Sequence, residues 1–321
     1  MIDLRGIAAL VVVLAAVLVP TIGSKSADET VPVVVAAEES VASGEPTEPA
    51  SIELAEFSLG SDSGPALEAL VYQRAAEAGR SSDGVGVSVT VSHRDNIVSV
   101  AGAAVFDPAS TAKVYWVAAA VDALGTEAVE PYAEAIFASS DNTAASRVID
   151  LVGIDAINEF TAAAGMADTY LSLWIDGGVR RTGAEAAERG FVNASSTADA
   201  VVFLDQLGAG ELLDPAATAQ VMAWMTKAPD SLDNPTAWGG VLTDQLPAEV
   251  AAFTMHKAGW LTPGCCVALD NQLQAIGIVP LPDGDRFSIA ITTADGADYE
   301  GQASWISGLT AEIYELLAAP T

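Results

Sequence analysis

Hydrophobic positions along the chain follow two different periods. In residues 86–92, valine alternates with serine and threonine, which is the period of a half-buried strand. Further apolar runs bounded by turn residues predict strands at 97–101, 253–260, 274–280 and 287–292. Apolar residues three and four positions apart predict helices over 66–78, 111–124, 141–152, 154–164, from Ser195 or Ser196 to Leu207, 214–225 and 302–317. Residues 166–193 show no clean period, and we predict a long loop there.

The order of these elements indicates the architecture. Two strands come early, three come late, and helices fill the middle. Early and late strands can share one sheet only if the helical middle is an inserted lobe. We therefore predict an α/β fold, in the α+β sense, in which an antiparallel sheet is flanked by helices and carries an inserted all-helical lobe.

The N-terminal residues show an export pattern. Residues 6–23 are apolar and uncharged, with Arg5 before them and Lys25 after them. Residues 1–23 are therefore predicted to be a signal peptide or an N-terminal membrane anchor. The protein is then expected outside the cytoplasm, secreted or in contact with a membrane through this segment. Residues 24–60 are rich in Ser, Ala, Glu and Pro and predict a disordered acidic spacer, followed by a folded domain over 61–321.

Composition removes several classes of function. Asp and Glu number 43 against 13 Lys and Arg, a net charge of −30, so phosphate backbones would repel the chain and nucleic acid is not an expected partner. Two histidines and two cysteines leave little material for a metal site, and no cofactor is expected. Cys265 and Cys266 are adjacent, which excludes an ordinary disulfide but not a vicinal bridge. The domain is expected to be a monomer.

A serine and a lysine at a predicted helix start point to a nucleophile. Ser110 and Lys113 lie one turn apart, so they share a helix face. A neutral Lys113 amine can deprotonate the Ser110 hydroxyl, and the N–H groups of the helix start stabilise developing negative charge. The chain has four lysines and 24 serines, so this spacing alone is weak evidence.

Two further motifs suggest the same chemistry. Ser140-Asp141-Asn142 opens another predicted helix, where the hydroxyl can pass on a proton and the amide can bind a lysine and a substrate carbonyl. Asp141 as a plain N-cap explains the same letters. On a late strand, Lys257 is followed by Gly259, which lets a ligand approach the backbone. The alternative is an edge-strand lysine that prevents aggregation.

In this order, the three motifs resemble the signature of class A β-lactamases and penicillin-binding proteins, Ser-x-x-Lys, Ser-Asp-Asn and Lys-Thr-Gly. The resemblance covers the chain from about Gly84 to the C-terminus. It implies that Ser110 is the acylated nucleophile and Lys113 its base. It also implies that Ser140 shuttles a proton to the leaving nitrogen and that Lys257 attracts a substrate carboxylate.

The resemblance also implies a binding surface. Asn142 would bind the substrate amide, Gly259 would allow close backbone approach, and the N–H groups of Ser110 and Trp260 would form an oxyanion hole. The third motif departs from the family, because Ala258 stands where the family has a threonine hydroxyl.

Two other departures affect the expected activity. Only 30 residues separate Ser110 from Ser140, about half the interval typical of class A enzymes, which predicts a more open site. The family's Glu-x-x-Leu-Asn, which activates water for deacylation, is absent between residues 169 and 193. Glu185 and Glu188 are the candidates nearby, although their context is more typical of solvated helix charges.

These observations leave three functions open. The first is an exported serine acyl-enzyme hydrolase acting on β-lactams with slow deacylation. The second is a peptidase acting on the D-Ala-D-Ala end of a cell-wall stem peptide, which the same serine can attack. The third is a penicillin- or peptidoglycan-binding protein that acylates without turnover.

Overall fold

The computed structural model describes residues 64–79, 86–190, 192–228, 239–262, 271–295 and 299–319. The predicted signal or anchor segment 1–23, the spacer 24–60 and the two cysteines lie outside these residues. Among the described helices, none combines the length and the apolar composition needed to cross a bilayer.

The central sheet has five antiparallel strands. They are β1 (Gly86–His93), β2 (Asn96–Val100), β5 (Met255–Leu261), β6 (Asn271–Pro280) and β7 (Arg286–Asp295). Their order across the sheet is β2-β1-β7-β6-β5, so the early pair joins the late three through β1 and β7. This confirms the prediction that early and late strands share one sheet around an inserted helical region.

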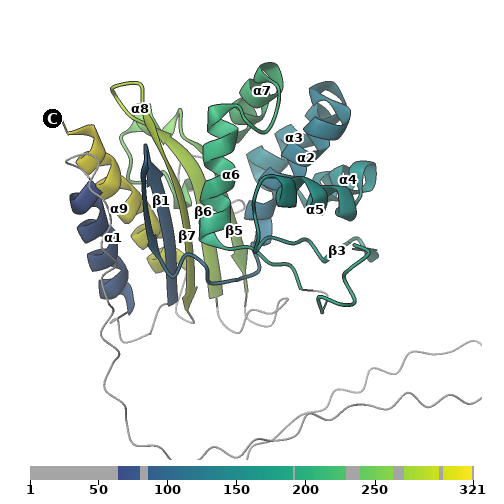
Figure 1. Cartoon of the computed structure of the whole chain (residues 1–321), viewed down its shortest axis with the longest axis horizontal. Helices are drawn as coiled ribbons and strands as arrows, with labels where there is room; N and C mark the ends of the chain where they lie inside the picture. The colour runs from purple at the N-terminus through teal and green to yellow at the C-terminus, as the bar shows by residue number, and fades with distance from the viewer. Residues whose placement is uncertain are drawn as a thin grey trace, which may run out of the picture. The chain divides into compact units, whose positions relative to one another are not determined.

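Two helices cover one face of this sheet, as Figure 1 shows at the left. They are α1 (Gly64–Gly79) and α9 (Tyr299–Ala318), the first and last helices of the described chain. Leu67 of α1 and Ile306 of α9 pack with Ile289 of β7 in a buried cluster. The alternation of strand residues therefore delivers one apolar set to this layer.

The helical lobe covers the opposite face and lies at the right of Figure 1. Its helices are α2 (Lys113–Leu124), α3 (Thr126–Ser139), α4 (Asn142–Val152), α5 (Ile154–Ala163), α6 (Thr197–Ala209) and α7 (Pro215–Met225). A 3₁₀ turn, Ala109–Ala112, leads into α2, and the short elements η2 (Gly239–Val241) and α8 (Ala248–Ala251) precede β5. Ser196 and Asp214 cap α6 and α7, at the positions where the sequence predicts these helices to begin.

The structure corrects the prediction for residues 166–193. A two-stranded hairpin, β3 (Leu173–Asp176) and β4 (Val179–Thr182), replaces part of the expected loop. Gly177 and Gly178 both have positive φ, which suits the tight turn between two short strands. Hydrophobic alternation misses this hairpin because its apolar residues Ile175 and Val179 are exposed, while Trp174 and Asp176 face the protein.

Candidate active site

The segment before α2 places Ser110 at a helix start. Phe106 pairs with Ser195 through two backbone hydrogen bonds of 2.9 Å, which fixes the chain as it enters the turn. The Asp107 carboxylate accepts a hydrogen bond from Ala109 N at 2.9 Å. Ser110 follows, half-buried, on the 3₁₀ turn that continues directly into α2.

Gly259 of β5 lies directly against the backbone of Ser110. A Cβ atom at Gly259 would lie 2.7 Å from Ser110 N and 2.8 Å from Thr111 N, closer than real Cβ atoms come to backbone. Glycine at this position therefore allows the strand to pass beside the helix start. The first and third motifs are thus brought together by the fold.

Lys113 is fully buried, and its amine is surrounded by acceptors from the second motif. The amine donates to Ser140 O at 2.6 Å, to Ser140 Oγ at 3.2 Å and to Asn142 Oδ1 at 2.7 Å. Within the described residues it makes no hydrogen bond to the Ser110 hydroxyl, so the predicted nucleophile–base contact is not formed in this structure. Catalytic hydrogen bonds often tighten only when substrate binds.

Ser140 joins two helices in a strained conformation. Its φ of 56° places it in the left-handed region, where a residue with a Cβ costs about 1 kcal/mol or more. It caps the end of α3, and Asp141 then caps the start of α4 by accepting from Ala144 N at 2.6 Å. The N-cap interpretation of Asp141 is therefore correct. The preceding residue, Ser140, directs its hydroxyl between Lys113 and Lys257.

Lys257 approaches Ser140 from the sheet. Its side chain is 2% exposed, and the amine donates to Ser140 Oγ at 3.0 Å and to Ala258 O at 2.6 Å. This position rules out the alternative of a solvated edge-strand lysine. Two amines from different layers of the fold thus share one serine hydroxyl.

Burial changes the acid–base behaviour of both amines. Desolvation lowers the pKa of Lys113 to about 7, although the charges of Asp141 and Asp176 oppose this change. Desolvation and the charge of Lys113 hold the pKa of Lys257 well below its usual range. A substantial fraction of Lys113 is therefore the neutral amine near pH 7, the form that accepts a proton.

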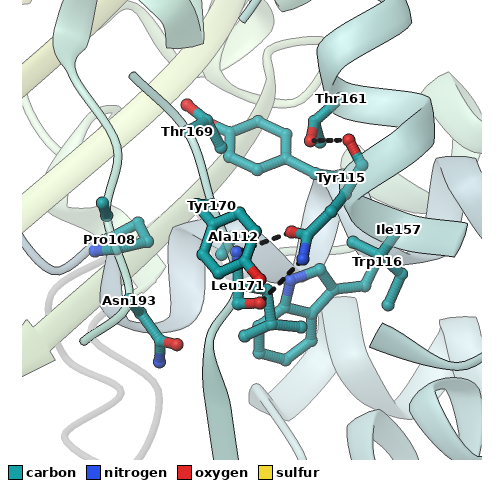
Figure 2. Close-up of a pocket in the computed structure, with 12 residues that line it drawn as sticks. Pro108, Ala112, Tyr115, Trp116, Ile157, Thr161, Thr169, Tyr170, Leu171 and Asn193 are labelled. Carbon is teal, nitrogen blue, oxygen red and sulfur yellow. Dashed lines mark hydrogen bonds between the residues drawn. The ribbon is translucent and has the colours of Figure 1, made fainter. Parts of the chain in front are cut away.

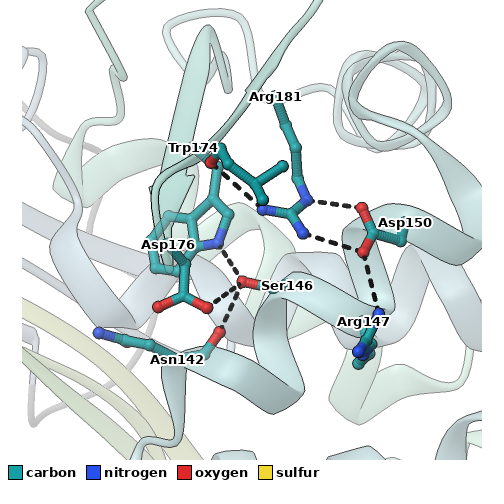
Figure 3. Close-up of polar contacts among 8 residues, drawn as sticks. Asn142, Ser146, Arg147, Asp150, Trp174, Asp176 and Arg181 are labelled. Atoms are coloured by element: carbon teal, nitrogen blue, oxygen red, sulfur yellow. Dashed lines mark hydrogen bonds and ion pairs between the residues drawn. The ribbon is translucent and has the colours of Figure 1, made fainter.

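One face of α4 carries both the site and the β3–β4 hairpin, as Figure 3 shows. Asn142, Ser146 and Asp150 recur every four residues, so they form one stripe along the helix. The Ser146 hydroxyl lies 2.9 Å from Asp176 Oδ2 and accepts from Trp174 Nε1 at 2.8 Å. We call Asn142, Ser146 and Asp150 the α4 stripe.

The far end of the α4 stripe holds the second strand of the hairpin. Arg181 donates to both oxygens of Asp150, at 2.5 and 2.9 Å. The indole of Trp174 lies over Lys113, with the amine 5.8 Å from the ring centroid, and packs edge-on against Trp116 at 5.0 Å. The hairpin is therefore a wall of the site.

Residues 128–317, more than half of the chain, match the sequence profile of the Beta-lactamase enzyme family. The chain belongs to this family. The matched residues include Ser140, Asn142 and Lys257, whereas Ser110 and Lys113 precede them. No curated protein sequence matches the chain.

Solved structures place this β-lactamase family member among serine β-lactamase folds. It is similar to a class A β-lactamase from Bacteroides cellulosilyticus with a TM-score of 0.63 and 18% identity, over 79% of this chain and 99% of the other. A β-lactamase from Sphaerobacter thermophilus gives 0.60 and 20%, over 78% and 98%. A PBP-A mutant, solved as the acyl-enzyme with penicillin G, gives 0.59 and 19%, over 78% and 96%. At 18–20% sequence identity, these structural similarities establish the fold alone.

Three residues singled out from the sequence lie away from the cluster in this β-lactamase family member. The Trp260 side chain packs with the apolar cluster next to α1 and α9, so only its backbone is available to the site. Glu185 and Glu188 are exposed, and Glu185 pairs with Arg189 at 3.1 Å. Neither carboxylate contacts the site within the described residues.

A small crevice lies behind the nucleophile segment rather than in the site (Figure 2). Pro108 and Ala112, on either side of Ser110, line it together with Leu171. The Asn158 amide holds this crevice together, because it donates to Leu171 O at 2.9 Å and accepts from Leu171 N at 2.8 Å. Asn158 therefore fixes the chain just before β3. Neither Ser110 nor Lys113 lines the crevice.

Proposed function

We propose that this chain is an exported serine acyl-enzyme hydrolase that acts on β-lactams and releases the product slowly. The observation that carries the proposal is the buried meeting of Lys113 and Lys257 on the Ser140 hydroxyl, with Ser110 held at a helix start against Gly259. Membership of the β-lactamase family supports it.

The proposed acylation uses the residues in turn. Neutral Lys113 takes the proton of the Ser110 hydroxyl as Oγ attacks the lactam carbonyl. The C–N bond breaks, and Ser140, bonded to both amines, passes a proton to the ring nitrogen. Asn142 holds the substrate amide, and the N–H groups of Ser110 and Trp260 stabilise the oxyanion.

Lys257 is proposed to attract the substrate carboxylate. Burial disfavours the charged form of Lys257, and an anionic substrate beside the amine would favour it again. Lys257→Ala should therefore weaken acylation by anionic β-lactams more than by neutral ones, and it should reduce the salt dependence of the rate. Equal losses for both substrate types would contradict this role.

The central test is covalent labelling at Ser110. Incubation with benzylpenicillin should add the mass of the whole antibiotic to the wild-type chain, because the opened ring stays attached. Ser110→Ala should abolish this addition. Ser139→Ala, which removes the exposed hydroxyl next to Ser140 in the sequence, should leave it unchanged. Labelling that persists in Ser110→Ala would refute the proposed nucleophile.

The absence of Glu-x-x-Leu-Asn also supports two alternatives, a D-Ala-D-Ala peptidase and a binding protein without turnover. A stem peptide loses its terminal D-Ala on acylation, so its adduct is lighter than the whole peptide. Rapid peptide release together with a permanent penicillin adduct would favour the peptidase. Turnover of a chromogenic cephalosporin would favour the β-lactamase.

Export is proposed from the sequence of residues 1–23, and a flexible spacer from residues 24–60. Limited proteolysis of the full chain should release a stable fragment that begins near residue 60. Mass spectrometry of that fragment defines its first residue. A protease-resistant segment between residues 24 and 58 would contradict the proposed spacer.

A further inference from the structure

Hydrolysis of an acyl-enzyme requires a base beside the ester, and the family's glutamate motif is absent here. This inference rests on the proposed function and concerns its second step. The carboxylates proposed from the sequence, Glu185 and Glu188, are exposed and do not contact the site within the described residues. The hairpin wall supplies a different carboxylate.

Asp176 ends β3 and faces the α4 stripe (Figure 3). Its side chain is half-buried, and Oδ2 lies 2.9 Å from the hydroxyl of Ser146, which is buried. The same hydroxyl accepts from Trp174 Nε1, and Asn142 O, 2.9 Å away, is a second acceptor for its single proton. The carboxylate is thus fixed one helical turn from Asn142, whose side chain accepts from the Lys113 amine.

The charges of Asp141 and Asp176 both oppose the lowering of the Lys113 pKa, so these two carboxylates are the candidates for a base. Asp141 Oδ1 accepts from Ala144 N as the N-cap of α4, so the fold already uses this carboxylate to begin the helix. Asp176 bonds to a neutral hydroxyl, and within the described residues its second oxygen accepts no hydrogen bond. That oxygen is available to a water molecule.

Asp176 is also held rigidly enough to position a water molecule. The positive φ values of Gly177 and Gly178 make the turn tight, and Arg181 ties the returning strand to Asp150 with two hydrogen bonds. Trp174, two residues before Asp176 on the same strand face, covers the Lys113 amine. The hairpin therefore holds its carboxylate on the same helix face as Asn142, close enough for its charge to act on the Lys113 amine.

We propose that Asp176, displayed by the β3–β4 hairpin, is the base that activates water to hydrolyse the Ser110 acyl-enzyme. Water adds to the ester carbonyl carbon while one of its protons moves to the Asp176 carboxylate. The tetrahedral intermediate then collapses, the bond between the carbonyl carbon and Ser110 Oγ breaks, and Oγ takes a proton that Lys113 draws from solvent. The product leaves as a carboxylic acid, and Asp176 returns its proton to solvent.

The experiment separates acylation from release. Wild-type protein and Asp176→Asn are acylated with benzylpenicillin, the free drug is removed by rapid desalting, and the adduct is followed by intact mass. Asparagine can still bond to Ser146 but is not basic. Acylation should change only slightly, because losing the Asp176 charge only lowers the Lys113 pKa further, and release should slow by about a hundredfold, the scale of a lost general base.

Matched variants test for a structural explanation. Glu185→Gln and Glu188→Gln remove the exposed carboxylates, and both variants should release the adduct at the wild-type rate. In Asp176→Ala, added formate should restore release in a saturable manner. A carboxylate that only supports the fold would not be replaced by a small anion in solution.

Each outcome decides the assignment. Equal release from Asp176→Asn and wild type would overturn it while leaving the proposed function intact. Parallel losses in acylation and release, with no formate rescue of Asp176→Ala, would show a structural role and overturn it as well. If wild-type protein forms no Ser110 adduct, the proposed function fails and this inference fails with it.

Discussion

The two faces of the central sheet bury different kinds of side chains. Toward α1 and α9, buried residues such as Ile289 and Ile306 form a hydrocarbon layer. A polar group in this layer, the Thr310 hydroxyl, bonds to its own helix at Ile306 O, 2.9 Å away. Toward the lobe, the sheet also buries apolar residues such as Ile276 and Ile278. On this face it buries Lys257 and Lys113 as well, although neither amine has a carboxylate as a hydrogen-bond partner within the described residues.

Burial of apolar side chains and burial of amines have different consequences. Apolar burial contributes roughly 25 cal/mol per Å² and needs no partner of defined geometry. Buried amines oppose folding unless acceptors surround them, and they are retained with altered pKa values. Substitutions in the apolar layer should therefore reduce stability, whereas substitutions at the buried amines should reduce reactivity.

Ile306→Ala should give the largest loss of stability. The side chain is fully buried, so truncation should lower the free energy of unfolding by about 2–5 kcal/mol. Acylation of the remaining folded protein should not change. Ile97→Ala, at a position that is 57% exposed, is the matched control and should shift stability by less than about 0.5 kcal/mol. Urea titration and penicillin labelling measure the two effects, and slower labelling in folded Ile306→Ala would contradict the separation.

Lys113→Ala should show the opposite pattern. Loss of the base should slow acylation of Ser110 by at least about a hundredfold, or about 2.7 kcal/mol. The protein should remain folded, because removing a buried amine also removes its desolvation cost. Stopped-flow labelling and circular dichroism test both statements. Loss of helical signal at 25 °C would mean that the amine is required for folding.

Gly259→Ala should have an intermediate effect on reactivity. The new Cβ would lie 2.7 Å from Ser110 N, so either β5 or the turn that begins α2 must shift. Misplacement of this kind should slow acylation by about tenfold or more. Gly284→Ala, in the β6–β7 turn, adds strain of its own at positive φ but lies away from Ser110. Comparable slowing in both variants would show that the effect is not local to Ser110.

A pH dependence of stability is also expected. The pKa of Lys113 is about 7 when folded and near its ordinary 10.5 when unfolded. Between these values the unfolded chain binds more protons, so the free energy of unfolding rises with pH. The melting temperature of wild type should therefore rise relative to Lys113→Met between pH 7 and about 9.5, as calorimetry can measure. Parallel curves would show that Lys113 titrates normally in the fold.

Sequence reasoning found the parts of the site that local patterns encode. Gly259 lies against Ser110, Lys113 and Lys257 both bond to Ser140, and Asp141 caps α4, whereas the predicted contact between Ser110 and Lys113 is not formed. Likewise, the alternation in β1 and the order of the elements gave the correct architecture.

The missed features depend on contacts that no local period shows. Helix α3 was not predicted; it contains Pro131 and begins directly after Gly125, and both residues weaken a helical pattern. The importance of Asp176 follows from docking of its hairpin on α4, since its neighbours in sequence are exposed apolar residues and glycines. The four-residue recurrence of Asn142, Ser146 and Asp150 was the available signal for that docking face.

The pairing of β1 with β7 also constrains the order of folding. Val89 and Ile291 are partners in the sheet, so the first strand cannot find its neighbour until almost the whole domain has been synthesised. The same holds for Lys113 and Lys257, which meet only once β5 has joined the sheet. A growing or truncated chain therefore has neither a complete five-stranded sheet nor two amines around Ser140. Penicillin labelling, if it occurs at Ser110, would report completed folding, and the long interval before completion is the period in which the apolar strands are exposed to aggregation.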